Sequence, residues 1–125
     1  MRVLLADDQA QVRWALRTAV GEQSGLTLVG EVSEADSLLR QTQMLKPDLV
    51  LLDEALPGQP LGAMLDALRR SGSSPTVVVL GLRPESESSA LTAGADLFVS
   101  KSAQPEQLLC LLRNFARKES LIGCK

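Results

Sequence analysis

The chain has 125 residues, a formal net charge of −2, 45% hydrophobic residues and only 2% aromatic residues. This length fits one domain, because a second hydrophobic core would have too few residues. The lysines and arginines are scattered, so no basic stripe is available for nucleic-acid phosphates, and we expect no direct binding to nucleic acid. The absence of histidine excludes histidine-based triads, histidine metal ligands and an internal phosphohistidine.

The N-terminal sequence has neither a long apolar span nor a secretory leader, since Met1 and Arg2 run directly into a short apolar stretch. We therefore expect a cytoplasmic protein with no membrane association. No internal repeat or low-complexity tract is present.

Short apolar runs of strand length alternate along the chain with segments whose apolar residues recur at helical spacing. Strands that are apolar on both faces and joined by helices form parallel sheets. The predicted fold is therefore an α/β three-layer sandwich, with a five-stranded parallel sheet and helices on both faces. For such a sheet we expect the common flavodoxin-like strand order 2-1-3-4-5. The strand-like runs are Val3 to Ala6, Leu26 to Val32, Leu49 to Leu52, Thr76 to Leu80 and Leu97 to Val99.

The helical segments differ in strength. The last is the clearest, because Pro105 and Glu106 open it and a wide apolar stripe follows. The segment from Pro84 to Gly94 is the weakest, because it holds four serine or threonine residues and only Leu91 as a large apolar residue. We predict a short, mobile fourth helix there.

Acidic residues follow two strands that are neighbours in this strand order. Asp7 and Asp8 come after the first strand, and Asp53 comes after the third. Ligands of open parallel sheets bind beyond the carboxyl ends of the strands, so three carboxylates would meet in one crevice. Like charges at close range demand a cation, and hard oxygen ligands favour Mg²⁺. Lys101 follows the fifth strand and would add an ammonium at the same rim, which indicates phosphoryl chemistry.

Several motifs surround these residues. Two are apolar runs that end in aspartate, Val3 to Asp8 and Pro47 to Asp53. The others are the turn Leu56 to Gly58, the segment Ala93 to Asp96 before Lys101, and Ser102 followed by Pro105 to Leu108. Their order and spacing resemble the receiver domain of two-component response regulators, most of all receivers that precede a helix-turn-helix output domain. The resemblance implies a receiver domain over residues 1–117 and a linker stub or C-terminal tail over residues 118–125. Either the chain is a single-domain regulator or it belongs to a longer one.

The resemblance also implies roles for individual residues. Asp53 would be the phosphoacceptor, taking a phosphoryl group from a sensor histidine kinase or phosphotransfer protein. Asp8 and Asp53 would bind Mg²⁺ through their side chains, and Ala55 through its backbone carbonyl. Asp7 would hold the water shell of the metal, and Lys101 would pair with a phosphoryl oxygen. The domain would catalyse its own phosphorylation and dephosphorylation, and would regulate transcription through an output domain outside this chain.

Two positions depart from the family pattern. Receivers usually carry serine or threonine at the end of the fourth strand, where the hydroxyl binds the phosphoryl group and couples it to an aromatic residue on the fifth strand. Here these switch positions are Gly81 and Phe98, neither of which has a hydroxyl, and the loop from Gly81 to Gly94 is shorter than usual. We therefore expect phosphorylation with weakened or rerouted coupling to the rest of the domain. Glu54 follows the acceptor, at a variable position of the family, and is assigned no role.

Other functions are weighed against this one. Gly81 and the short loop favour a degenerate receiver that binds a protein partner without phosphorylation. A phosphatase of the haloacid-dehalogenase type would need a second aspartate where this chain has Ala55. A nucleotide-binding protein would need a glycine-rich phosphate loop, and none opens a helix here.

A homodimer is a further possibility that the sequence leaves open. The last helix and the tail hold more apolar residues than one buried stripe needs, among them Leu109 and Ile122. Related receivers dimerise through the faces of their fourth and fifth helices or their first and fifth helices. The alternative is a linker that packs on a domain outside this chain.

Overall fold

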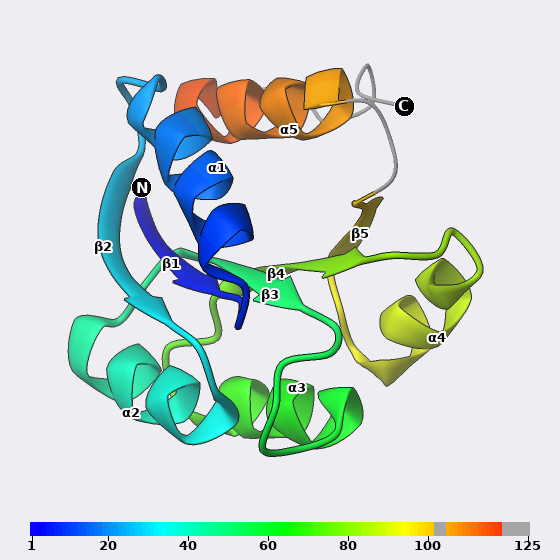
Figure 1. Cartoon of the computed structure of the whole chain (residues 1–125). Helices are drawn as coiled ribbons and strands as arrows, with labels where there is room; N and C mark the ends of the chain where they lie inside the picture. Colours follow the sequence, from blue (N-terminus) through cyan, green and yellow to red (C-terminus); the bar gives the residue numbers. More distant parts are fainter. Residues whose placement is uncertain (102–104, 119–125) are drawn as a thin grey trace.

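The computed structural model describes residues 1–101 and 105–118. Within these ranges, five strands and five helices alternate along the chain. All the strands are parallel and form one sheet in the order β2-β1-β3-β4-β5, as predicted (Figure 1). The elements are β1 (Arg2–Ala6), α1 (Ala10–Gly21), β2 (Thr27–Val32), α2 (Ala35–Leu45), β3 (Leu49–Asp53), α3 (Leu61–Arg70), β4 (Thr76–Gly81), α4 (Ser86–Ala93), β5 (Leu97–Ser100) and α5 (Pro105–Arg117).

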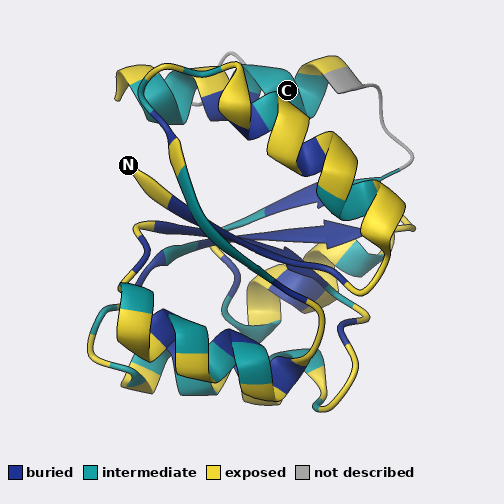
Figure 2. Ribbon diagram, turned by 60° about the vertical axis from the view of Figure 1, so that its left-hand side comes forward, coloured by how far each residue is buried: buried dark blue, intermediate teal, exposed yellow. Residues whose placement is uncertain are grey.

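Helices cover both faces of the sheet. Helices α1 and α5 lie on one face, α2 and α3 lie on the other, and α4 lies near β5 (Figure 1). Successive residues of β1 point to opposite faces, so Val3 and Leu5 join the core under α1 and α5, whereas Leu4 and Ala6 join the core under α2 and α3. Figure 2 shows the strands as the buried centre of the molecule and the exposed residues on the outer faces of the helices.

The register of the sheet brings the carboxyl ends of four strands to one edge. Ala6 at the end of β1 pairs with Leu52 of β3, and Gly81 at the end of β4 pairs with Ser100 of β5. Every residue of β3 is buried, because this strand lies at the centre of the sheet with helices on both sides. The residues that follow β1, β3 and β5 therefore meet beyond this edge, where polar side chains lie outside the apolar core.

Helix α4 has a small buried face. It spans eight residues, and Ala90 is its buried residue, while Leu91 is 43% exposed. Gly94 ends the helix in the left-handed conformation, with φ of 119°, which glycine adopts without strain. The prediction of a short fourth helix is confirmed, and its mobility stays a prediction.

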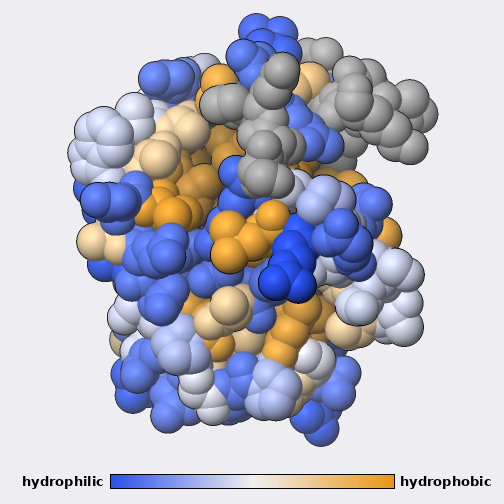
Figure 3. All heavy atoms as spheres, turned by 45° about the vertical axis from the view of Figure 1, so that its right-hand side comes forward, coloured by the Kyte–Doolittle hydropathy of each residue, from blue (hydrophilic) through white to orange (hydrophobic). Residues whose placement is uncertain are grey.

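The surface on the side of α4 and β5 is mixed, with separate hydrophobic patches between charged and polar groups (Figure 3). The most exposed large hydrophobic residues of the described chain include Trp14 on α1, Met44 on α2 and Leu82 after β4. Single exposed hydrophobic residues on separate elements are ordinary for a folded domain. Across the described ranges, no helix combines the length and the apolar character needed to cross a membrane.

The loop before β2 approaches the end of α5 so closely that only glycine fits. A Cβ atom on Gly25 would collide with the backbone carbonyl of Ala116, whereas a Cβ atom on Gly21 would meet nothing within 4 Å. We expect Gly25→Ala to lower the free energy of unfolding by about 1–3 kcal/mol, because backbone atoms must move apart. Gly21→Ala, at the end of α1, is the matched control and should be neutral or stabilising by up to about 1 kcal/mol. Urea unfolding measures both, and equal stabilities would contradict the close approach.

Candidate functional site

Three carboxylates meet at the carboxyl edge of the sheet. Asp7 and Asp8 follow β1, and Asp53 is the last residue of β3. One oxygen atom from each carboxylate lies within 4.8 Å of the other two. Asp7 is fully buried and Asp53 is 5% exposed, whereas Asp8 is exposed. The cluster therefore concentrates negative charge at a position that solvent reaches from the side of Asp8.

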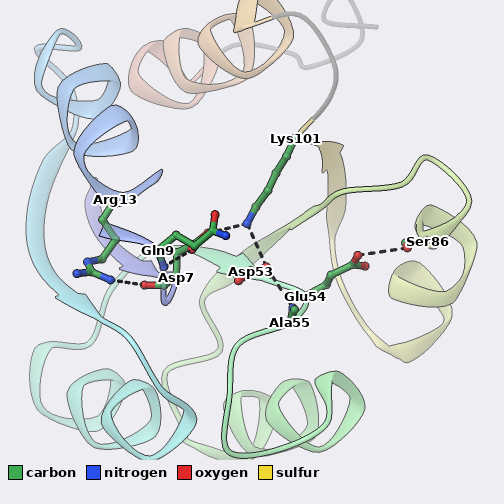
Figure 4. Close-up of polar contacts among 8 residues, drawn as sticks. All are labelled: Asp7, Gln9, Arg13, Asp53, Glu54, Ala55, Ser86 and Lys101. Atoms are coloured by element: carbon green, nitrogen blue, oxygen red, sulfur yellow. Dashed lines mark hydrogen bonds and ion pairs between the residues drawn. The ribbon is translucent and has the colours of Figure 1, made fainter. Parts of the chain in front are cut away.

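Lys101 supplies the positive charge at this cluster. Its Nζ atom lies 2.8 Å from Asp7 Oδ2 and 3.1 Å from Asp53 Oδ1 (Figure 4). The side chain is only 15% exposed, and the backbone N–H of Lys101 donates a hydrogen bond of 2.6 Å to the carbonyl of Gly81. This bond between the ends of β4 and β5 holds Lys101 beside the carboxylates.

Burial and charge shift the pKa values of two of these groups. Burial raises the pKa of Asp53, and the negative charge of Asp7 adds to the rise, while the Ala55 N–H and Lys101 oppose it. Burial alone would lower the pKa of Lys101, but hydrogen bonds and charge from Asp7 and Asp53 raise it above its ordinary value. The lysine is thus held as a cation, and the ionised form of Asp53 is destabilised by its surroundings.

Asp7 is fixed by hydrogen bonds from several directions. Its Oδ1 atom accepts the backbone N–H of Gln9 at 2.9 Å, and its backbone carbonyl accepts Nη1 of Arg13 at 2.7 Å (Figure 4). Its own N–H donates to the carbonyl of Val32 at 3.1 Å. Rigid support of this kind places a buried carboxylate before any ligand arrives.

The turn after β3 wraps around Asp53. The N–H of Ala55 donates to Asp53 Oδ1 at 3.1 Å, and the N–H of Leu56 donates to the Asp53 carbonyl at 3.2 Å. The turn continues to Pro57, whose carbonyl accepts the N–H of Ala35 at 2.9 Å. Ala55 is exposed and lies next to the carboxylate cluster.

Glu54 occupies the space beside Gly81. A Cβ atom on Gly81 would lie 2.7 Å from Cε2 of Phe98 and 2.8 Å from Cδ of Glu54. Ser86, the first residue of α4, donates a hydrogen bond of 3.3 Å to Glu54 Oε1 (Figure 4). The sequence pattern assigns Glu54 no role. No local signal could reveal this contact, because its partners are distant in the chain and meet only in the folded sheet.

The structure brings together the four charged residues that the sequence singles out, Asp7, Asp8, Asp53 and Lys101. It places the ring of Phe98, from β5, against Gly81 at the end of β4. The family motif at Ser102 lies outside the described residues.

Comparison with known proteins identifies the family. The family described as "Response regulator receiver domain" matches residues 3–113. This chain belongs to that family. It is 33% identical over 123 residues to the nitrate/nitrite response regulator protein NarL of Escherichia coli (strain K12), and the aligned region covers 97% of this chain and 57% of NarL. It is 32% identical over 122 residues to the two-component response regulator PhoP of Pseudomonas aeruginosa, over 96% of this chain and 53% of PhoP. The receiver thus spans about half the length of these relatives.

A solved receiver domain has the same fold as this chain. The signal receiver domain of NarL from Mycobacterium tuberculosis matches this structure with a TM-score of 0.81 at 24% identity, over 93% of this chain and 95% of that domain. This receiver therefore has the flavodoxin-like architecture that its sequence predicts. Family membership supports the receiver interpretation and counts against the phosphatase and nucleotide-binding alternatives.

The raised pKa of Asp53 predicts how stability depends on pH. The folded protein holds a proton on Asp53 more tightly than the unfolded chain does, so the contribution of this group to stability decreases as pH rises above the unfolded pKa of about 4. The decrease ends above the folded-state pKa. We expect Asp53→Asn to be more stable than wild type at pH 7 in metal-free buffer, and the advantage to shrink as the pH is lowered through that window.

Urea unfolding across this pH range measures the effect. The control is Asp66→Asn, which changes an exposed carboxylate on α3. An Asp53→Asn variant that is less stable than wild type at pH 7 would contradict the prediction.

Proposed function

We propose that this receiver domain accepts a phosphoryl group on Asp53, with Mg²⁺, from a sensor histidine kinase or phosphotransfer protein in a two-component phosphorelay. One observation carries the proposal: the buried Asp53 carboxylate lies 3.1 Å from Lys101 within the cluster that it forms with Asp7 and Asp8. A nucleophile, a cation and further acidic ligands at one edge of the sheet are the parts that phosphoryl transfer needs.

The chemistry assigned to Asp53 is nucleophilic attack. A carboxylate oxygen of Asp53 forms a bond to phosphorus as the bond from phosphorus to the donor nitrogen breaks, and the carboxylate has no proton to lose. Lys101 stabilises the negative charge on the phosphoryl oxygens, since its ammonium already lies against the acceptor. Asp7 also holds Lys101 in place, through the 2.8 Å contact.

The donor set fits Mg²⁺. Three carboxylates with oxygens within 4.8 Å of one another are hard ligands, and the exposure of Asp8 leaves room for the waters that Mg²⁺ retains. Asp8 and Asp53 would bind the ion through their side chains and Ala55 through its carbonyl, while Asp7 would hold a metal-bound water. Bound Mg²⁺ would neutralise charge on the phosphoryl group.

The wider roles belong to the same proposal. The receiver domain corresponds to residues 1–117, and the segment 118–125 is a linker or tail, of which residues 119–125 lie outside the described residues. The domain acts in the cytoplasm, regulates transcription through an output domain outside this chain, and itself binds no nucleic acid or membrane. Self-association as a homodimer is part of the proposal.

One observation favours a second function. The Glu54 carboxylate lies where a side chain at position 81 would begin, which puts a negative charge at the switch position of the family. A receiver of this kind could bind a protein partner without being phosphorylated. The two functions differ in whether Asp53 gains a phosphoryl group.

Phosphorylation can be tested directly. The purified protein is incubated with Mg²⁺ and acetyl phosphate, and the intact masses of wild type, Asp53→Ala and Asp66→Ala are compared. We expect a phosphoryl-sized gain in wild type and in the exposed control Asp66→Ala, and none in Asp53→Ala, because Asp53 is the proposed nucleophile. No gain in wild type, even from a phosphohistidine donor, would favour the binding-module function.

Metal binding can be tested without phosphorylation. Mg²⁺ at about 100 times its dissociation constant should stabilise the folded protein by about 2.7 kcal/mol, because only the folded state assembles the site. Asp8→Asn should lose much of this stabilisation, since it removes the exposed ligand, and Asp66→Asn should retain it. Thermal unfolding with Mg²⁺ or EDTA measures the difference. Equal stabilisation of wild type and Asp8→Asn would count against the assigned ligand.

A further inference from the structure

The place of a side chain at position 81 is filled by two other residues. Gly81 is buried at the end of β4, and its absent Cβ would lie 2.7 Å from the Phe98 ring and 2.8 Å from both Cδ and Oε2 of Glu54. Contacts under 3 Å mean that no larger residue fits unless Glu54 and Phe98 move. The inward position of the Glu54 side chain therefore requires glycine at position 81.

Glu54 connects three elements at this edge. Its backbone N–H donates to the carbonyl of Leu80 on β4 at 2.9 Å. Its carboxylate lies beside Gly81 and accepts the hydroxyl of Ser86, at the start of α4, at 3.3 Å. Figure 4 shows the side chain reaching from the end of β3 toward α4, on the side away from Lys101. Through Glu54, the residue next to the acceptor contacts α4.

Helix α4 packs against β5, α3 and β4 through a small buried face. Ala90 is its buried residue, in the same core cluster as Phe98, and Leu91 is 43% exposed. A helix with so small a buried face gains little from packing, so a hydrogen bond to a charged group at its first residue adds to what holds it in place.

We propose that Glu54 is the positioning residue that couples Asp53 to α4, in place of the side chain that Gly81 lacks. Phosphorylation of Asp53 drives the Glu54 carboxylate away from Gly81, breaks its hydrogen bond with Ser86 and loosens the start of α4. This inference rests on the proposed phosphorylation of Asp53.

The driving force is repulsion between neighbouring negative groups. Phosphorylation replaces the single charge of the Asp53 carboxylate by a group of about two negative charges. Asp53 pairs with Leu80 in the sheet, and Gly81 follows Leu80, so the Glu54 carboxylate and the new charge share one edge. Both lie in a partly buried region, where charges interact more strongly than in water. Glu54 can relieve the repulsion by rotating into solvent.

The experiment combines intact-mass measurement with hydrogen exchange of the same samples, all in Mg²⁺, with and without acetyl phosphate. In wild type, phosphorylation should speed amide exchange at the start of α4 about tenfold, the effect of losing one hydrogen bond to a charged group. Glu54→Gln keeps the size and a hydrogen-bond acceptor but removes the charge, so it should gain phosphate without the change in α4. Glu87→Gln, the same substitution at an exposed position on α4, should respond as wild type does.

Two further variants test the contact in unphosphorylated protein. Ser86→Ala removes the donor of the hydrogen bond, and Gly81→Ala puts a Cβ where the Glu54 carboxylate lies. Both should speed exchange of α4 without phosphate, while exchange in α1 and β3 stays as in wild type. Unchanged α4 exchange in both variants would overturn the inference.

The outcomes separate the inference from the proposed function. Phosphate gain in wild type without a change in α4, or an equal change in Glu54→Gln, overturns the coupling role of Glu54 and leaves phosphorylation standing. No phosphate gain in wild type removes the proposed function and the inference together. Phosphate gain with a response that depends on Glu54 supports both.

Discussion

The balance of charge around Asp53 is the constraint on which this structure depends. Asp7 and Asp53 are almost completely buried at neighbouring strand ends, where two carboxylates without a cation would repel each other. Lys101 lies within 3.1 Å of both and supplies that cation from the far side of the sheet. One lysine does not offset three carboxylates, so the cluster of Asp7, Asp8 and Asp53 keeps a surplus of negative charge. Burial, with the negative charge of Asp7 added to it, raises the pKa of Asp53.

The parallel sheet makes this arrangement possible. Strands β1, β3, β4 and β5 all end at one edge, so residues far apart in the chain reach one site. Apolar side chains of these strands pack on both faces and leave the strand ends as the place where charged groups gather. The backbone bond from Lys101 to Gly81 ties two of these ends together. Packing of the core thereby sets the distances on which the site chemistry depends.

The charged cluster and the switch positions differ in how far they follow the family pattern. Asp53, Lys101 and the other acidic residues match it, whereas Gly81 has no hydroxyl and Phe98 keeps the aromatic ring without one. The Glu54 carboxylate fills the resulting space and contacts α4. The space that a side chain at position 81 would occupy is thus filled by Glu54, which follows the neighbouring strand β3.

The sequence by itself determined the alternation of strands and helices, the short fourth helix and the residues of the charged site. It could do so because these features depend on local patterns: apolar runs of strand length, breakers between them, and acidic residues placed directly after strands. The strand order followed from a common topology of such sheets and not from a local pattern. Only the tertiary structure decided where Glu54 lies. Its position depends on the missing side chain of Gly81, the ring of Phe98 and the hydroxyl of Ser86, which come together through strand pairing and packing. Contacts between distant residues leave no periodic signal in a single sequence, so three-dimensional packing alone reveals them.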